Sequence, residues 1–536
     1  MPAGPIQPER FWRAFCAGAT ASLVLPVLLA PVGELPLGGA RGFQLLLVLA
    51  AVAALLLGRL PLRELLEAPP PAWAERALLA AGLAFFLGCQ VTNFAALEVN
   101  GIDFSIFDWM IHNAHSGKGM FSPIYGVNHL GVHPTWLLYL WVPLHALVDT
   151  PWWLVVSNAL VLWLGALPLL GLARALALPR AVAFLALVAY LTNPWLGRLL
   201  DGGFRPESLY PAAGLFLALA WVKQRPLLLG GAAALYLAVK EDAALHLLGL
   251  AVGVLLFDRA RWRAAVGIAG ASVAVLIFNV AWLQPTLLAP YGVRQPTYVT
   301  FWGQYGQTLP SIAGAMLTSP WKVISSIATS SWFKFFLPAL GVPLLARVPA
   351  AAMAPVIFLL GTSGNVVMHD YRAYYPVPLL AFAFWGLLEV AKRSEPRWRT
   401  AAVAGLVLFP LFGGGYATLE WPAHRNIFGA ELASLRQRVE QSPELVCTQT
   451  ILFPQLGYRA HLYELTPDCL ADARSIAVLH PDLAPWPYRR EQLLAWISAA
   501  RATGRLESLP GGYEVIRSGS GNVAPDGEPG GHRQQQ

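Results

Sequence analysis

The stretch LLLGGAAALYLAVKEDAALHLLGLAVGVLLF, residues 227–257, is apolar except for the charged triplet Lys240-Glu241-Asp242 near its middle. One ionised side chain at the centre of a bilayer costs roughly 2.5–3.5 kcal/mol, so the triplet needs water, an ionic partner or a ligand. Basic residues precede and follow the stretch, and this places both of its ends in the cytoplasm by the positive-inside rule. The stretch is therefore predicted to form two membrane passes with the triplet at the outer turn.

The depth of this turn follows from the length of its arms. Each arm has about 14 residues and spans roughly 21 Å, whereas the hydrocarbon core is about 30 Å thick. We therefore expect the triplet to lie in a water-filled dip that faces outward, and we interpret the dip as a functional cavity. In a simpler alternative, Lys240 only neutralises its two acidic neighbours, but local pairing does not explain such short arms.

The composition indicates the class of protein. Of the 536 residues, 56% are hydrophobic and 12% charged, whereas a soluble protein carries about 25% charged residues. The chain is therefore predicted to be a polytopic membrane protein. Its Ala-, Leu- and Arg-rich composition suggests a bacterium, so the expected location is the bacterial inner membrane. The net charge of +7 is typical of basic cytoplasmic loops and does not indicate a nucleic-acid partner. Cys447 and Cys469 lie in a polar region, where they either form a disulfide, if the region is extracytoplasmic, or stay free.

Apolar segments and basic loops predict an all-α membrane protein of about thirteen spans, with the N-terminus inside and the C-terminal region outside. Besides the hairpin, the expected spans are 11–32, 43–58, 77–95, 152–172, 181–197, 208–222, 264–283, 331–347, 349–366, 376–391 and 400–417. The predicted division is an N-terminal region (1–76), a membrane core (77–419) with an outer loop (96–151), a small α/β domain (420–518) and a disordered tail (519–536). In the α/β domain, helical runs at 431–441 and 489–500 alternate with strand-like runs at 475–479 and 513–516.

Acidic and histidine side chains follow the third predicted span. Asp103 comes directly after it and Asp108 five residues later, so the two would point about 140° apart on a straight helix. Each is interpreted as a general base or a metal ligand, with helix capping (Asp103) or a solvated face (Asp108) as the alternative. A site that uses both would need a bend between them. His133, before Pro134, is a candidate site residue or a turn histidine.

The sequence does not define a complete metal site. His129 and His133 have the spacing of two zinc ligands on a helix, but Gly131 and Pro134 disfavour a regular helix, and no HExxH motif occurs. Apart from His133, the histidines of the loop (His112, His115 and His129) are expected to be solvated. The carboxylates would suit a divalent cation such as Mg²⁺ or Mn²⁺, and the sequence does not decide whether one binds.

Positive charges at the outer side suggest binding of a phosphate. Arg205, at the corner before the sixth span, offers a bidentate fork that suits phosphate; alternatively, it snorkels while Glu207 favours a helix N-terminus. Lys240 would supply a second positive charge to the same phosphate, while Glu241 and Asp242 would position it or orient an acceptor.

A fourth polar cluster, residues 369–376, lies outside between two later spans. His369 and Arg372 are its candidate cavity residues, and its tyrosines are assigned to the interfacial belt. Four clusters from distant parts of the chain predict one outward-facing site. Its expected chemistry is displacement of a phosphate: a carboxylate deprotonates the acceptor, and cations stabilise the charge on the leaving group.

The order of these motifs resembles a known family. Asp103 and Asp108, then His133-Pro134, Phe204-Arg205-Pro206-Glu207 and Lys240-Glu241-Asp242 are similar to the multi-pass membrane family DUF2079 over about residues 77–480. That family resembles a branch of the GT-C glycosyltransferases, some of which use a divalent metal. The resemblance implies a catalytic Asp in the first outer loop, here Asp103. Where the family has His, this chain has Arg205, which keeps a phosphate contact but no His-specific role.

The leading hypothesis is therefore an inverting glycosyltransferase. It would transfer a hexose or pentose from a polyprenyl-phosphate sugar lipid to an extracytoplasmic acceptor, with Asp103 as base and Arg205 and Lys240 at the phosphate. One alternative is a lipid or solute transporter, which predicts charges along both halves of the membrane. The other is a non-enzymatic envelope scaffold, which predicts Lys240 buried in ion pairs with no access for a lipid.

Overall fold

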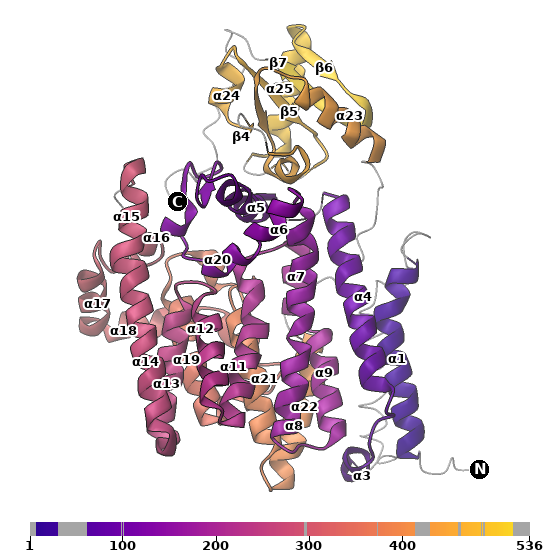
Figure 1. The fold of residues 1–536 in the computed structure, drawn as a ribbon, viewed down its shortest axis with the longest axis vertical. Helices are drawn as coiled ribbons and strands as arrows, with labels where there is room; N and C mark the ends of the chain where they lie inside the picture. Colours follow the sequence, from indigo (N-terminus) through magenta and orange to yellow (C-terminus); the bar gives the residue numbers. More distant parts are fainter. Residues whose placement is uncertain are drawn as a thin grey trace.

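The computed structural model describes residues 7–29, 62–97, 99, 101–293, 297–371, 373–412, 429–458, 462–483, 485 and 488–517. A helical bundle carries a small α/β domain at one end (Figure 1). The predicted second span (43–58) and the predicted disordered tail (519–536) lie outside the described residues.

Apolar helices form the bundle, because a helix satisfies its own backbone groups where water is absent. Four continuous helical stretches of the described residues are long and apolar enough to cross a membrane: Ala74–Ala95, Trp152–Ala175, Arg180–Asp201 and Arg259–Tyr291. In chain order the helices are α1 (Pro8–Leu29), α3 (Leu62–Glu67), α4 (Ala74–Ala95), α7 (Trp152–Leu164), α8 (Ala166–Ala175), α9 (Arg180–Leu191), α10 (Pro194–Asp201), α11 (Tyr210–Lys223), α12 (Pro226–Leu237), α13 (Ala243–Phe257), α14 (Trp262–Ile277), α15 (Gln284–Leu288), α19 (Arg347–Thr362), α21 (Val377–Ala391) and α22 (Pro396–Phe412). The count of thirteen spans stays a prediction.

The charged triplet lies at the turn of a helical hairpin. Its arms, α12 and α13, have 12 and 15 residues, which corresponds to about 18 and 22 Å of helix. α13 packs closely against α19, since a Cβ atom added at Gly249 would lie 2.5 Å from the carbonyl oxygen of Ala351. The two short arms expected from the sequence are therefore present.

The predicted span at 331–347 is wrong as a regular helix. This segment holds two 3-10 helices, η8 (Trp332–Phe335) and η9 (Val342–Leu345). The chain breaks between them at Leu340 and Gly341, which adopt φ angles of 54° and 65°, and Pro343 follows.

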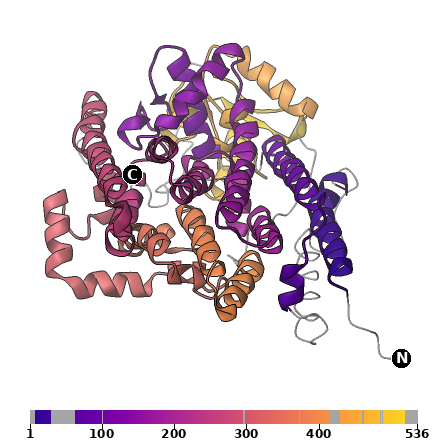
Figure 2. The ribbon, with the colours of Figure 1, turned by 60° about the horizontal axis from the view of Figure 1, so that its bottom comes forward.

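The stretch before this segment, residues 297–329, is mostly helical. It contains α16 (Thr297–Trp302), α17 (Leu309–Thr318) and α18 (Pro320–Thr329). These helices lie at the flank of the bundle opposite α1 and α4 (Figures 1 and 2).

The C-terminal domain is a mixed five-stranded sheet with helices, as the alternating pattern predicts. The strands are β3 (Leu445–Thr448), β4 (Leu462–Glu464), β5 (Ser475–Leu479), β6 (Leu506–Ser508) and β7 (Glu514–Arg517), in the order β4-β3-β5-β7-β6. β3 pairs in parallel with β4 and β5, and β7 is antiparallel to β5 and β6. The helices are α23 (Gly429–Glu440), α24 (Pro467–Ala471) and α25 (Arg490–Ala502). A disulfide joins Cys447 on β3 to Cys469 on α24, with the Cα atoms 6.4 Å apart.

The domain rests on α5 (Gly101–His115) and α6 (Val142–Leu147), which lie between it and the bundle (Figure 1). Trp109 of α5 is buried in the same apolar cluster as Leu435 and Leu452 of the domain. Contact at the start of α5 is tight, because a Cβ atom at Gly101 would lie 2.3 Å from the Cα atom of Ile451. The domain therefore fixes the position of the helix that carries Asp103.

Candidate active site

A cavity of about 480 Å³ lies beside α5. Its wall includes five of the ten predicted site residues: Asp103, His133, Arg205, Glu207 and Lys240. They come from α5, the loop before α6, the corner before α11 and the turn of the charged hairpin. Residues that are remote in sequence thus line one cavity.

Asp103 and Arg205 form one side of the cavity. Asp103 stands in the first turn of α5, where the partial positive charge of the helix N-terminus favours a carboxylate. Its Oδ2 atom lies 2.9 Å from Nη2 of Arg205, and that guanidinium lies 3.9 Å over the ring centroid of Tyr374. The Arg205 side chain is 7% exposed and that of Asp103 is 29% exposed. The acid is therefore the more accessible partner.

Lys240 and Glu207 form a second, deeper ion pair. Nζ of Lys240 donates a hydrogen bond of 2.7 Å to Oε1 of Glu207, and the two side chains are 13% and 8% exposed. Glu207 belongs to the 3-10 helix η4 (Pro206–Leu209), which leads into α11. The Lys240 ammonium is thus held against a carboxylate on the cavity wall.

The other two triplet residues do not line the cavity. Oε1 of Glu241 lies 2.8 Å from Nδ1 of His133, so Glu241 fixes the orientation of that imidazole. Asp242 accepts a hydrogen bond from the hydroxyl of Tyr210. Glu241 is therefore a neighbour of the site, whereas the structure directs Asp242 toward α11.

The structure does not bring Asp108 to the cavity, which corrects its assignment beside Asp103. α5 continues without a bend, so five residues of helix turn Asp108 to the opposite face. Its side chain is fully buried and accepts a hydrogen bond of 2.8 Å from the hydroxyl of Tyr458 in the α/β domain. The geometry gives Asp108 a structural position at the domain interface.

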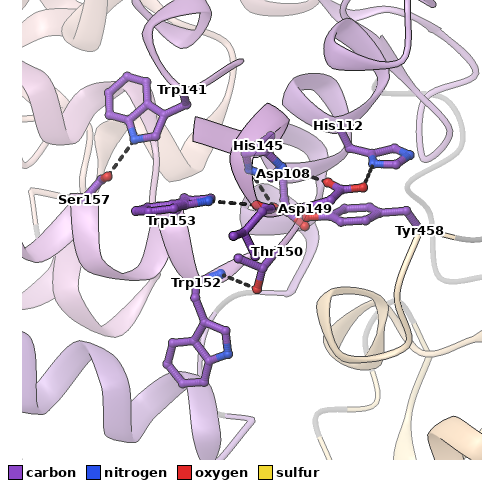
Figure 3. A network of polar contacts seen from close by, with 11 residues as sticks. Asp108, His112, Trp141, His145, Asp149, Thr150, Trp152, Trp153, Ser157 and Tyr458 are labelled. Carbon is purple, nitrogen blue, oxygen red and sulfur yellow. Dashed lines mark hydrogen bonds and ion pairs between the residues drawn. The ribbon is translucent and has the colours of Figure 1, made fainter. Parts of the chain in front are cut away.

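Asp108 belongs to a polar network between α5, α6 and the domain (Figure 3). Asp149 lies 2.7 Å from Nδ1 of His112 and 3.1 Å from Nδ1 of His145, and the rings of His112 and Tyr458 stack with centroids 4.0 Å apart. Burial raises the pKa of Asp108 to about 8; the Tyr458 hydrogen bond opposes this shift, and the charge of Asp149 adds to it. Burial therefore favours the neutral form of the Asp108 carboxyl.

Two further predicted residues do not join the site. Nε2 of His369 donates a hydrogen bond of 2.6 Å to the carbonyl of Ser363, and His369 does not line the cavity. A local backbone partner thus holds this side chain, which corrects its assignment to the cavity. Arg372 lies outside the described residues.

Several cavity residues were not assigned from the sequence. Tyr374 and Tyr375 line the cavity, although tyrosines of their segment were assigned to the interfacial belt. Tyr125 also lines it and stacks on His129, with ring centroids 5.0 Å apart. His129 is 2% exposed, so its assignment as a solvated histidine is wrong. The only sequence signal for these four side chains is their place in loops that also carry site residues.

Metal ligands are a separate question. Among the residues that the structure describes, no group of three or more His, Cys, Asp or Glu side chains is arranged to hold a metal ion. We assign no residue to that role. The positive charges that face the cavity are the side chains of Arg205 and Lys240.

Comparison with known proteins identifies the family. A family model described as a predicted membrane protein, DUF2079, matches residues 93–507. The chain belongs to this family. The match includes α5, the cavity residues and the α/β domain up to β6, so the DUF2079 region contains both the site and the domain that contacts α5.

Comparison with curated proteins finds no match. Among solved structures, this DUF2079 protein is similar to the crystal structure of ArnT from Cupriavidus metallidurans bound to undecaprenyl phosphate, with a TM-score of 0.46 and 11% identity. The similarity covers 85% of this chain and 100% of that one. A TM-score below 0.5 does not establish a shared fold, so the residues of this chain alone support the function proposed for it.

Proposed function

We propose that this protein is a membrane glycosyltransferase. It takes a sugar from a polyprenyl-phosphate donor and transfers it to an acceptor on the extracytoplasmic side of the bacterial inner membrane. The observation that carries this proposal is the convergence of one accessible carboxylate, Asp103, and two cations, Arg205 and Lys240, on one cavity.

The reaction requires little of the protein beyond these groups. A hydroxyl oxygen of the acceptor forms a bond to the anomeric carbon of the sugar, and the bond from that carbon to the phosphate oxygen breaks. The hydroxyl proton passes to Asp103, and the bonding electron pair leaves with the polyprenyl phosphate. Arg205 and Lys240 stabilise the charge on the leaving group, because cations that are already in position act on developing charge without reorganisation.

The Asp103–Arg205 pair suits this sequence of events. A guanidinium binds phosphate in the same bidentate way as carboxylate, so the phosphate of a bound donor competes with Asp103 for Arg205. Donor binding then frees the carboxylate to act as a base. The guanidinium of Arg205 stays in place when the phosphate binds, because one of its faces lies on the ring of Tyr374.

The test is mass spectrometry of lipids that remain with the full-length protein in native nanodiscs. We expect a polyprenyl phosphate, or its glycosylated form, with the wild-type protein, and its loss from the double variant Arg205→Gln/Lys240→Gln. The control variant Arg474→Gln removes a cation that pairs with Asp472 at the surface of the α/β domain. Equal retention by all three proteins, or no such lipid with the wild type, would reject the proposal.

A non-enzymatic envelope protein is the second candidate, and one observation favours it. Lys240 is engaged by Glu207, as expected if the charged triplet is only structural. A structural ion pair does not require an adjoining cavity, and Lys240 lines one. The two candidates are separated by measuring sugar transfer in a Lys240 variant whose stability has been restored by a second substitution at Glu207.

A further inference from the structure

A second cavity lies at the end of the bundle opposite the α/β domain. Its volume is about 790 Å³, and it is lined by the ends of α8, α11, α13 and α21 and by the start of α19. α8 and the domain are at opposite ends of the molecule in Figure 1. In the proposed topology this end faces the cytoplasm.

The lining of this cavity has an excess of positive charge. Four cations line it, Arg261, Arg347, Lys392 and Arg393, against two acids, Asp258 and Glu389. Both acids are engaged: Oδ2 of Asp258 lies 3.2 Å from Nε of Arg261, and Glu389 accepts a hydrogen bond of 3.1 Å from the indole of Trp385.

The three remaining cations, within the part of the chain that the structure describes, form no ion pair with a carboxylate: Arg347, Lys392 and Arg393. Arg393 is held in place, since its Nη2 atom donates a hydrogen bond of 2.7 Å to the carbonyl of Leu345. Arg347 opens α19, a helix of 16 residues, so the helix N-terminus adds partial positive charge at the same place.

The positive-inside rule explains basic residues on this side, but it does not explain their convergence on one cavity. Exposed cytoplasmic cations normally spread over loops in water. Here the cations line the same cavity as the large apolar side chains of Trp221, Phe257 and Trp385. A basic pocket between membrane helices at the cytoplasmic side is the arrangement that binds anionic lipid headgroups.

An apolar groove continues from the basic cavity. A hollow of about 910 Å³ lies between α12 and α14, and Trp221, Gln224 and Arg261 line both spaces. Small residues such as Gly230 and Gly267 line the groove, and a Cβ atom at either would have open space. A molecule with an anionic head and apolar chains would fit both spaces at once, whereas a soluble phosphate would use only one.

We propose that these two spaces bind an anionic phospholipid of the inner leaflet. Its phosphate lies among Arg347, Lys392 and Arg393, and an acyl chain lies along the groove between α12 and α14. The inference does not depend on sugar transfer. It assigns a lipid site to the end of the bundle away from Asp103.

The experiment uses the full-length protein in nanodiscs of phosphatidylcholine containing phosphatidylglycerol, analysed by native mass spectrometry. We expect the wild type to retain phosphatidylglycerol in preference to phosphatidylcholine. The variant Arg347→Gln/Lys392→Gln/Arg393→Gln should lose this preference by about tenfold or more, since each cation near the surface contributes to binding of anionic lipids. The matched control, Arg180→Gln/Arg259→Gln/Arg397→Gln, removes three cations that do not line the cavity and should keep the preference.

Three further measurements complete the test. Lys392→Gln alone removes an exposed side chain, so a smaller loss of preference is expected even if the triple variant misfolds. Gly267→Leu should weaken retention of phosphatidylglycerol by filling the groove. Glycerol phosphate should not displace the lipid. The proposal is overturned if the control variant loses as much preference as the cavity variant, if Lys392→Gln and Gly267→Leu leave it unchanged, or if glycerol phosphate displaces the lipid.

Discussion

The carboxylate of Asp103 and the guanidinium of Arg205 lie 2.9 Å apart on the wall of the cavity beside α5. One comes from the first turn of α5 and the other from the corner before α11, so this contact ties α5 to the helical bundle. The same contact keeps the proposed base engaged until an anion replaces it at Arg205. Catalysis and donor binding are therefore expected to be coupled through this pair.

Asp103→Asn is expected to reduce sugar transfer by about 10²–10⁴-fold, the usual contribution of a general base. The amide keeps the size of the side chain and an oxygen that accepts a hydrogen bond from Arg205, so the protein should stay folded. Transfer rate and thermal unfolding of the purified protein in nanodiscs are the measurements. Asp472→Asn, at the domain surface, is the control and should leave both unchanged. A wild-type rate in Asp103→Asn would contradict the role of base.

Lys240→Met should lower the free energy of unfolding by roughly 3–5 kcal/mol, because it leaves the buried Glu207 carboxylate without its partner. Adding Glu207→Gln removes that stranded charge and should restore most of the stability. Sugar transfer should stay low in the double variant, because the cation for the leaving phosphate is still missing. Denaturation and transfer assays on both single variants and the double variant give the comparison. Recovery of transfer together with stability would favour a structural role for Lys240.

The sequence predicted the charged hairpin well, because its signal is local. The cost of ionised groups in lipid and the length of two apolar arms determine where Lys240 lies, and neither depends on distant parts of the chain. Arg205 and Glu207 were proposed as site residues for a similar reason, since charges at the corner of a span have few explanations other than a site or an interface, and both line the cavity.

Asp108 shows the limit of that reasoning. Its environment is created by Tyr458, a residue of the C-terminal domain, and no local pattern indicates this contact. From the sequence, Tyr374 is likewise interpreted as an ordinary interfacial aromatic residue. Only the structure shows that the Arg205 guanidinium lies over its ring. The broken segment at 331–347 was missed because its composition is that of a span, and only Gly341 and Pro343 mark the interruption.

Asp108 should also make stability depend on pH. Its pKa is raised to about 8 in the folded protein from a usual value of 3.8, so between these values the folded state holds one proton more than the unfolded state. Stability therefore falls as pH rises toward 8, by up to roughly 1.4 kcal/mol per unit for one such group. The range from about pH 7 to 8 isolates this effect, because histidines of the unfolded chain titrate near pH 6.5.

Asp108→Asn removes this titration, so the decline of melting temperature between about pH 7 and 8 should be smaller than in the wild type. Thermal unfolding in one detergent at several pH values measures the difference. Asp482→Asn, an exposed residue paired with Arg490, is the control and should keep the wild-type slope. Identical slopes in wild type and Asp108→Asn would show that Asp108 is ionised in the folded protein.

Gly101→Ala tests whether the α/β domain positions Asp103. The added Cβ atom would lie 2.3 Å from the Cα atom of Ile451 and 2.5 Å from the carbonyl oxygen of Thr450, and backbone atoms cannot turn aside as a flexible side chain can. The start of α5 must therefore move away from the domain, and Asp103, two residues later, must move with it.

We expect Gly101→Ala to lower sugar transfer by more than tenfold while donor lipid is still retained, because a small displacement of a catalytic group affects the chemical step strongly. Gly270→Ala is the matched control, since a Cβ atom there meets nothing within 4 Å. Limited proteolysis of the C-terminal domain reports loosening of the contact. Normal transfer in a Gly101→Ala protein whose domain is released would contradict this role of the domain. The ion pair between Asp103 and Arg205 would then be sufficient to position the base.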